Sequence, residues 1–181
     1  MYLESIINAL DIATTENDLN NIKEELIITG YIKKNSKSKS KDNKNNKPLH
    51  YISSDGFDMY VGKNNLQNDE LTFKFASNSD WWFHAKQMPG SHVIVKTNGK
   101  ELPDRTFEEA AALAAYYSKG RDLDKVEVDY VLKKEVKKPA AAKPGFVVYY
   151  TNYSLIAIAD IKGIKEVTLS YKCFLDSQLF I

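Results

Sequence analysis

Several features are scarce in this sequence, and each scarcity excludes a class of protein. Its 181 residues contain one cysteine, Cys173, which excludes an internal disulfide framework and a cysteine-based metal site and fits a reducing compartment. No apolar run approaches the roughly 20 residues of a membrane span. The N-terminal residues carry acids and lack the basic start of a secretory signal, so we expect a cytoplasmic protein without a membrane partner.

Net charge is also small, at +1, but it is unevenly distributed. Residues 1–32 carry a net charge of −5, residues 33–47 a net charge of +6, and residues 48–181 are neutral. The main part of the chain therefore exerts no overall attraction on a polyanion. Any nucleic-acid site there must come from local clustering of cations.

Residues 1–32 are predicted to be helical. Two apolar stripes at helical spacing carry this prediction: Leu3, Ile6, Ile7 and Leu10, then Leu19, Ile22 and Leu26. Thr15 and Asp18 have the spacing of a capping box, and Gly30 is a natural stop. The second stripe is too short to be stable alone, so we expect it to pack on the main domain or to continue a longer helix.

Residues 33–47 are rich in lysine, serine and asparagine and contain no hydrophobic side chain. Such a segment cannot form a core and is predicted to be a flexible linker. It could serve as a polybasic arm that contacts phosphate or as a solvated tether, and the tether is favoured because like charges extend linkers in any case.

Residues 48–165 are predicted to form the folded domain. Strand-like alternation occurs at residues 50–54, 57–62, 71–76, 81–86, 92–97, 126–132, 146–151 and 153–159. Asp55-Gly56 predicts a hairpin with a primed turn, and Pro89-Gly90 and Asn98-Gly99 predict further turns.

One main helix follows these strands. Thr106 and Glu109 have capping-box spacing and Gly120 is the expected stop. Small and apolar side chains form its predicted core face: Ala110, Leu113, Ala114 and Tyr117. The predicted fold class is α+β, with a mostly antiparallel or mixed sheet and one main helix, preceded by the short helical segment.

Residues 80–93 concentrate groups capable of chemistry, and three interpretations compete. Asp80, His84 and His92 could bind zinc or iron. Ser91 beside His92 could belong to a catalytic triad, although neighbouring strand residues point to opposite faces. Trp82, His84 and Lys86 share one strand face and could stack on bases and neutralise phosphate. Recognition is favoured, while burial and exposure of Trp82 are equally compatible with the sequence.

An amide-rich stretch follows the second predicted strand. Its candidate RNA contacts are Lys63, Asn64, Asn65, Gln67 and Asn68. Amides can donate to and accept from base edges and sugars, but they also stabilise turns. Spacing alone favours the turn interpretation.

A second candidate is basic. Lys133, Lys134, Lys137, Lys138 and Lys143 surround a single acid, Glu135, in a segment that two prolines keep out of regular structure. Such a segment beside a sheet could follow a phosphate backbone or could be an ordinary solvated loop. Arg121 could join it or cap the preceding helix.

Four stretches together resemble the NFACT-R domain of the RqcH and NEMF type of ribosome-associated quality-control proteins, some of which are called fibronectin-binding proteins. They are SSDGFDMYVGKNNLQNDELTFKFA, DWWFHAKQMPGSHVIV, AAALAAYYSKGR and VEVDYVLKKEVKKPAAAKPGFVVYYTNY. The likeness spans roughly residues 49–153. It implies that residues 1–32 are the end of a coiled-coil region. Residues 166–181 extend beyond the family's core and could add a strand or an oligomer contact.

The resemblance implies a non-catalytic RNA-binding module without a cofactor. The family binds obstructed large ribosomal subunits, and its bacterial members recruit alanine tRNA for alanine tailing of stalled chains. Large-subunit RNA and tRNA are therefore the expected partners, with no small-molecule substrate. The resemblance shifts the balance toward binding for Lys63, the amides at 64, 65, 67 and 68, His84, Lys86, Ser91 and His92. A fibronectin-binding adhesin is the alternative, and a metal-dependent enzyme a third hypothesis.

Overall fold

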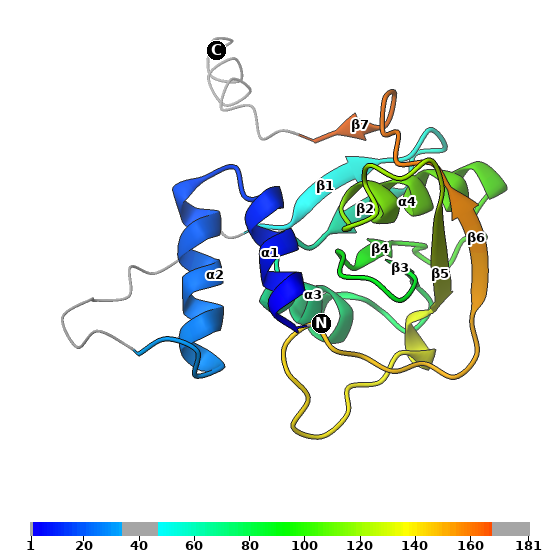
Figure 1. Cartoon of the computed structure of the whole chain (residues 1–181). Helices are drawn as coiled ribbons and strands as arrows, with labels where there is room; N and C mark the ends of the chain where they lie inside the picture. Colours follow the sequence, from blue (N-terminus) through cyan, green and yellow to red (C-terminus); the bar gives the residue numbers. More distant parts are fainter. Residues whose placement is uncertain (1, 34–46, 168–181) are drawn as a thin grey trace, which may run out of the picture.

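The computed structural model describes residues 2–33 and 47–167. A seven-stranded sheet forms the centre, and a helical pair lies beside it (Figure 1). The strands are β1 (Leu49–Ile52), β2 (Asp58–Val61), β3 (Trp81–Ala85), β4 (Val93–Val95), β5 (Val126–Leu132), β6 (Tyr153–Ala157) and β7 (Lys165–Glu166). The helices are α1 (Tyr2–Ile12), α2 (Glu16–Ile28), α3 (Asn65–Glu70) and α4 (Asp104–Tyr116), with a π-helix at Leu71–Phe75 and a 3-10 turn at Lys133–Glu135.

The strand order is β6-β5-β3-β4-β2-β1-β7, and every paired strand is antiparallel. The predicted α+β class is therefore confirmed. Of the segment predicted to be a linker, residues 34–46 lie outside the described residues, as do residues 168–181 of the C-terminal extension. None of the helices in the described ranges is long and apolar enough to cross a membrane.

Strand β3 separates two hydrophobic layers, because successive strand side chains point to opposite faces. Phe83 and Ala85 are fully buried on the α4 side, where Trp81 also packs. Trp82 is 0% exposed on the opposite side, where it packs with Leu71 and other apolar residues. The open question of Trp82 is thus settled as burial, and this ring cannot stack on RNA in this conformation.

Helix α4 covers the first face with its predicted side chains, since Ala110, Leu113 and Ala114 are fully buried. Small residues allow the helix to approach the sheet closely. The predicted capping box is wrong, because Pro103 is the N-cap and makes no side-chain cap bond. Thr106 Oγ1 instead donates to Asp55 Oδ2 (2.8 Å), so this residue fastens the β1–β2 loop. The helix also ends at Tyr116, before Gly120.

Two predicted strands have other structures. Residues 71–75 form the π-helix that continues α3, with Leu71 and Thr72 buried. Their alternating pattern is overridden by the helix that begins at the Asn64 cap. Residues 146–151 form no strand and pair only through a single bridge between Val148 and Lys137.

The predicted hairpins form, but one turn differs from expectation. Gly56 alone is left-handed (φ 83°) in the β1–β2 loop, and its N–H donates to the Ser53 carbonyl (2.9 Å). A primed turn has at least a left-handed first central residue, but neither Ser54 nor Asp55 is left-handed, so that prediction is wrong in its detail. Asn98 (φ 50°) and Gly99 (φ 79°) are both left-handed and form such a turn after β4.

The helical pair has the predicted caps. Thr15 and Asp18 form a reciprocal capping box at the start of α2, and Gly30 is left-handed (φ 80°) after its end. The buried contacts between the helices involve Ile6, Ala9 and Ile22. The remaining members of the predicted stripes are mostly exposed: Leu3, Ile7, Leu10 and Leu19. Of the two alternatives left open by the sequence, the structure shows the pair packed on the domain, with Ile12 in the main core.

Candidate nucleic-acid interface

The amide-rich stretch folds inward. Asn64 is the N-cap of α3, and its Oδ1 accepts the N–H of Gln67 (3.0 Å). Gln67 Oε1 accepts the N–H of Lys63 (2.9 Å). The four amides at positions 64, 65, 67 and 68 are all buried, at most 6% exposed. They cannot contact RNA in this conformation and instead determine how α3 begins, as the turn interpretation held.

Asn68 joins α3 to the turn before β4. Its Oδ1 accepts the N–H of His92 (3.0 Å), and its Nδ2 donates to the Gly90 carbonyl (3.3 Å). A Cβ added at Gly62 would overlap Asn68 Oδ1, so the approach requires glycine. These contacts of Asn68 hold the Pro89–His92 turn against α3.

The two histidines lie together but are uncharged. Their rings meet edge to face at 5.4 Å, and both contact the Trp82 ring. Burial lowers the pKa of His84 to about 4 and holds the pKa of His92 well below its usual value, with His84 adding to the effect on His92. His92 Nδ1 also lies 2.8 Å from Thr72 Oγ1. His92 is buried and His84 half-buried, and neutral imidazoles do not neutralise phosphate at pH 7.

Asp80 is not part of this histidine pair. Its carboxylate binds Lys96 Nζ (2.5 Å) and accepts the N–H of Thr97 (3.1 Å). No three metal-ligating side chains converge within residues 2–33 and 47–167. Ser91 is buried and its N–H donates to the Tyr117 carbonyl (3.0 Å). The arrangement therefore brings together neither the metal set nor the triad considered from the sequence.

Three predicted cations are held by local partners. Lys63 pairs with Asp18 of α2, and Lys86 pairs with Glu127 (2.5 Å). Arg121 donates to the Tyr116 carbonyl (2.9 Å) and lies over the Tyr116 ring, so it caps α4. Lys86 also lies away from Lys133, because Lys86 follows the end of β3 whereas the backbone N–H of Lys133 donates to the carbonyl of Asp80, just before β3. The predicted residues do not form one continuous surface.

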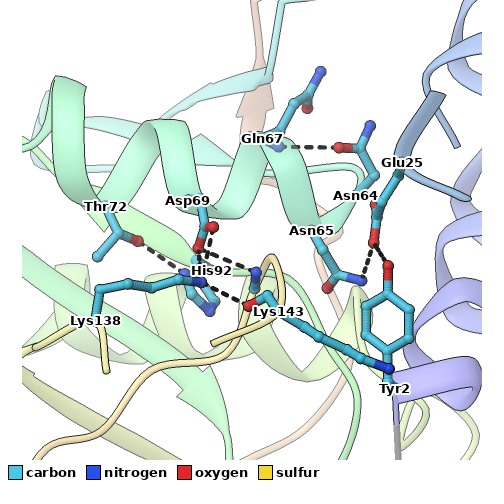
Figure 2. Close-up of polar contacts among 11 residues, drawn as sticks. Tyr2, Glu25, Asn64, Asn65, Gln67, Asp69, Thr72, His92, Lys138 and Lys143 are labelled. Atoms are coloured by element: carbon cyan, nitrogen blue, oxygen red, sulfur yellow. Dashed lines mark hydrogen bonds and ion pairs between the residues drawn. The ribbon is translucent and has the colours of Figure 1, made fainter. Parts of the chain in front are cut away.

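The basic segment is held against α3 through Lys138, and some of its other lysines are exposed. Lys138 Nζ binds Asp69 (2.8 Å) and the Lys143 carbonyl (2.7 Å) (Figure 2). Lys134 and Lys137 are exposed, and neither forms an ion pair within the part of the chain that the structure describes. These two side chains are available to a polyanion, and the fixed loop limits the entropy lost on binding.

The helical pair docks on the same region through contacts that the sequence did not predict. Glu25 is 0% exposed and accepts bonds from Asn65 Nδ2 and the Tyr2 hydroxyl, each 2.8 Å (Figure 2). Burial raises the pKa of the Glu25 carboxyl, although these hydrogen bonds oppose the rise. Lys143 completes the junction, with its Nζ over the rings of Tyr2 (4.5 Å) and Tyr31 (4.8 Å). The signal in the sequence was weak, because all these partners are far apart along the chain.

The sequence profile of the family described as "NFACT protein RNA binding domain" matches residues 47–151. This chain belongs to that family. The match covers the whole of α3, the Pro89–His92 turn and the basic segment, so these three elements lie within the family's domain.

Relatives and a solved structure agree with this assignment. The chain is 47% identical over 150 residues to "Rqc2 homolog RqcH" of Streptococcus suis, covering 82% of this chain and 26% of the relative. It is 40% identical over 161 residues to the protein of the same name in Bacillus subtilis, covering 88% and 28%. It also resembles the C-terminal part of the fibronectin/fibrinogen-binding protein from Streptococcus suis (TM-score 0.83, 44% identity, covering 91% and 66%). The chain spans less than a third of the length of these curated relatives.

Proposed function

We propose that this chain is a non-catalytic RNA-binding module of a cytoplasmic ribosome-associated quality-control factor. Its partners would be large-subunit RNA and tRNA. The observation that carries the proposal is the pair of exposed lysines, Lys134 and Lys137, on a loop that Lys138 and Asp69 hold against the domain. Membership of an RNA-binding family supports the same conclusion.

Action on obstructed large subunits and support of alanine tailing are proposed for the full-length protein. The relatives named for this pathway are more than three times as long as the matched segment. The module would contribute phosphate contacts, and tailing would need parts of the full-length protein beyond this segment. Recruitment of alanine tRNA is included in this proposal.

Salt-dependent RNA binding tests the proposal. We expect the double variant Lys134→Ala, Lys137→Ala to bind tRNA about tenfold more weakly and to lower the log–log salt slope by about 1.5, because two phosphate contacts are lost. Fluorescence anisotropy with tRNA and with a large-subunit RNA fragment measures both. The matched control is Lys100→Ala, Lys162→Ala, which removes two exposed lysines elsewhere. Equal binding by the two double variants would contradict the proposed surface.

A second candidate function is adhesion to a matrix protein. The solved relative from Streptococcus suis carries fibronectin and fibrinogen binding in its title, and the folds match closely. Purified fibronectin should bind the chain at high salt if this function holds here. Absence of binding to immobilised fibronectin, together with salt-sensitive tRNA binding, would exclude adhesion in favour of RNA recognition.

A further inference from the structure

A cavity of about 550 Å³ opens on the sheet face that carries Trp82. Strands β1 and β2 contribute His50 and Tyr60, and the π-helix contributes Leu71 and Phe75. Its volume lies within the range of about 300–1,000 Å³ typical of small-molecule sites. Of the RNA-contact residues predicted from the sequence, Gln67 alone is among the residues that line it.

Three rings form a prearranged wall in this cavity. His50 and Tyr60 stack with centroids 4.4 Å apart and planes 5° apart. Phe75 meets Tyr60 edge to face at 4.8 Å. Asp58 holds the imidazole in place, since its Oδ1 lies 2.7 Å from His50 Nε2. Ring surfaces fixed in this way can stack on a further planar group at little cost in side-chain entropy.

Charged groups surround the rings. Lys47 and Lys74 also line the cavity and are exposed, and neither forms a salt bridge with another described residue. Glu70 supplies a carboxylate that can accept from the N–H groups of a base. A bare anion would not need the rings, and an apolar ligand would not need the lysines. Together they fit a planar heterocycle that carries a phosphate.

We propose that this cavity binds one unpaired nucleotide of the bound RNA. Its base would stack on the His50, Tyr60 and Phe75 wall, and Lys47 and Lys74 would neutralise its phosphate. The inference rests on the proposed RNA-binding function and adds a second, base-directed contact. Helix α3 separates the two sites, because Asp69 binds Lys138 while the adjacent Glu70 lines the cavity.

Binding of small probes to the whole chain tests the cavity directly. Nuclear magnetic resonance titrations would compare the four nucleoside 5′-monophosphates with ribose 5-phosphate, which lacks the base. We expect shifts at His50, Tyr60 and Phe75, and at least one nucleotide binding about tenfold more tightly than ribose 5-phosphate, as base stacking contributes on this scale.

Variants sharpen the result. Phe75→Leu should weaken nucleotide binding about fivefold or more by removing a ring, and Lys74→Ala should weaken it several-fold by removing a cation. Lys100→Ala is the matched lysine control, because it is exposed and does not line the cavity. The amide spectrum of each variant shows whether it is folded.

Two outcomes overturn the inference. Nucleotides and ribose 5-phosphate binding equally would show an anion site without base recognition. Absence of shifts in the cavity, while tRNA still binds and depends on Lys134 and Lys137, would remove the cavity and leave the proposed function intact. Failure of the proposed function is a separate result, namely no binding of tRNA or large-subunit RNA by the unaltered chain.

Discussion

The amide-rich stretch at 64–68 and the basic segment at 133–143 are both RNA-binding candidates in the sequence. In the structure they have opposite roles. The amides are buried and each has contacts within the fold, whereas Lys134 and Lys137 extend into solvent. The difference lies in local partners: some of the amides bond to backbone groups within a few residues, and Lys138 binds Asp69, whereas no described acid pairs with Lys134 or Lys137. Composition alone does not show which polar side chains stabilise the fold and which are free to bind RNA.

Asn68→Ala should produce the largest effect on stability. It removes the bonds to His92 N–H and the Gly90 carbonyl and leaves both groups without that partner. We expect a loss of about 3 kcal/mol in the free energy of unfolding. Chemical denaturation measures it, with Asn152→Ala at an exposed site as the control. A loss no greater than that of the control would mean that the amide does not support the turn.

Gly62→Ala should be the next most damaging change. The new methyl group would overlap Asn68 Oδ1, and two hydrogen bonds, one at Oδ1 and one at Nδ2, hold this side-chain amide in place. We expect a loss of about 2 kcal/mol, as for overpacking in a core. Gly56→Ala is an instructive comparison, since nothing lies near its added Cβ and only its left-handed backbone (φ 83°) opposes alanine, at about 1 kcal/mol. A larger loss of stability for Gly56→Ala than for Gly62→Ala would show that the contacts around Asn68 adjust to the added methyl group at little cost.

Acid should destabilise the region around His84 and His92. His84 has a folded pKa of about 4 against an ordinary value of 6.5, and the pKa of His92 is lowered as well. The unfolded chain therefore binds more protons between these values. Stability is fully present above pH 6.5 and falls as the pH drops toward 4, by up to about 1.4 kcal/mol per pH unit for each imidazole. Denaturation midpoints across this range measure the slope, and His84→Gln should reduce it. A slope unchanged by that variant would contradict the assignment.

The smallest effect on stability is expected at the other region. Lys134→Ala with Lys137→Ala should change the free energy of unfolding by no more than about 0.5 kcal/mol, because both side chains are exposed and unpaired within the described structure. Thermal denaturation beside the RNA-binding assay checks this. A large loss of stability would mean that these lysines, like the buried amides, stabilise the fold.

Local sequence signals predicted much of the fold. Alternation identified β3, β4 and β5, the Thr15 box marked α2, and the Asn98-Gly99 turn was recognised. Residues 71–75 were misassigned because their alternation is also compatible with a buried helical stretch, and the Asn64 cap decides between them. Thr106 has the spacing of a helix cap, but its hydroxyl bonds to Asp55, which is 51 residues away in the chain.

The candidate sites were predictable only in part. The lysines at 134 and 137 were identified because charge density is visible in the sequence. The cavity was not, since His50, Tyr60 and Phe75 come from three separate elements and converge only when the sheet forms. Burial of Trp82 depended on a second layer that the sequence did not reveal, namely the π-helix and the segment after β5.

Lys143 has a mechanical consequence. Its backbone carbonyl accepts from Lys138, and its ammonium group is clasped by the rings of Tyr2 and Tyr31. The loop that presents the free cations is thereby tethered at one end to the helical pair. A swing of those helices would pull on the loop and change the spacing of the charges it displays, so a force on the helices would be transmitted to the surface that we propose binds RNA.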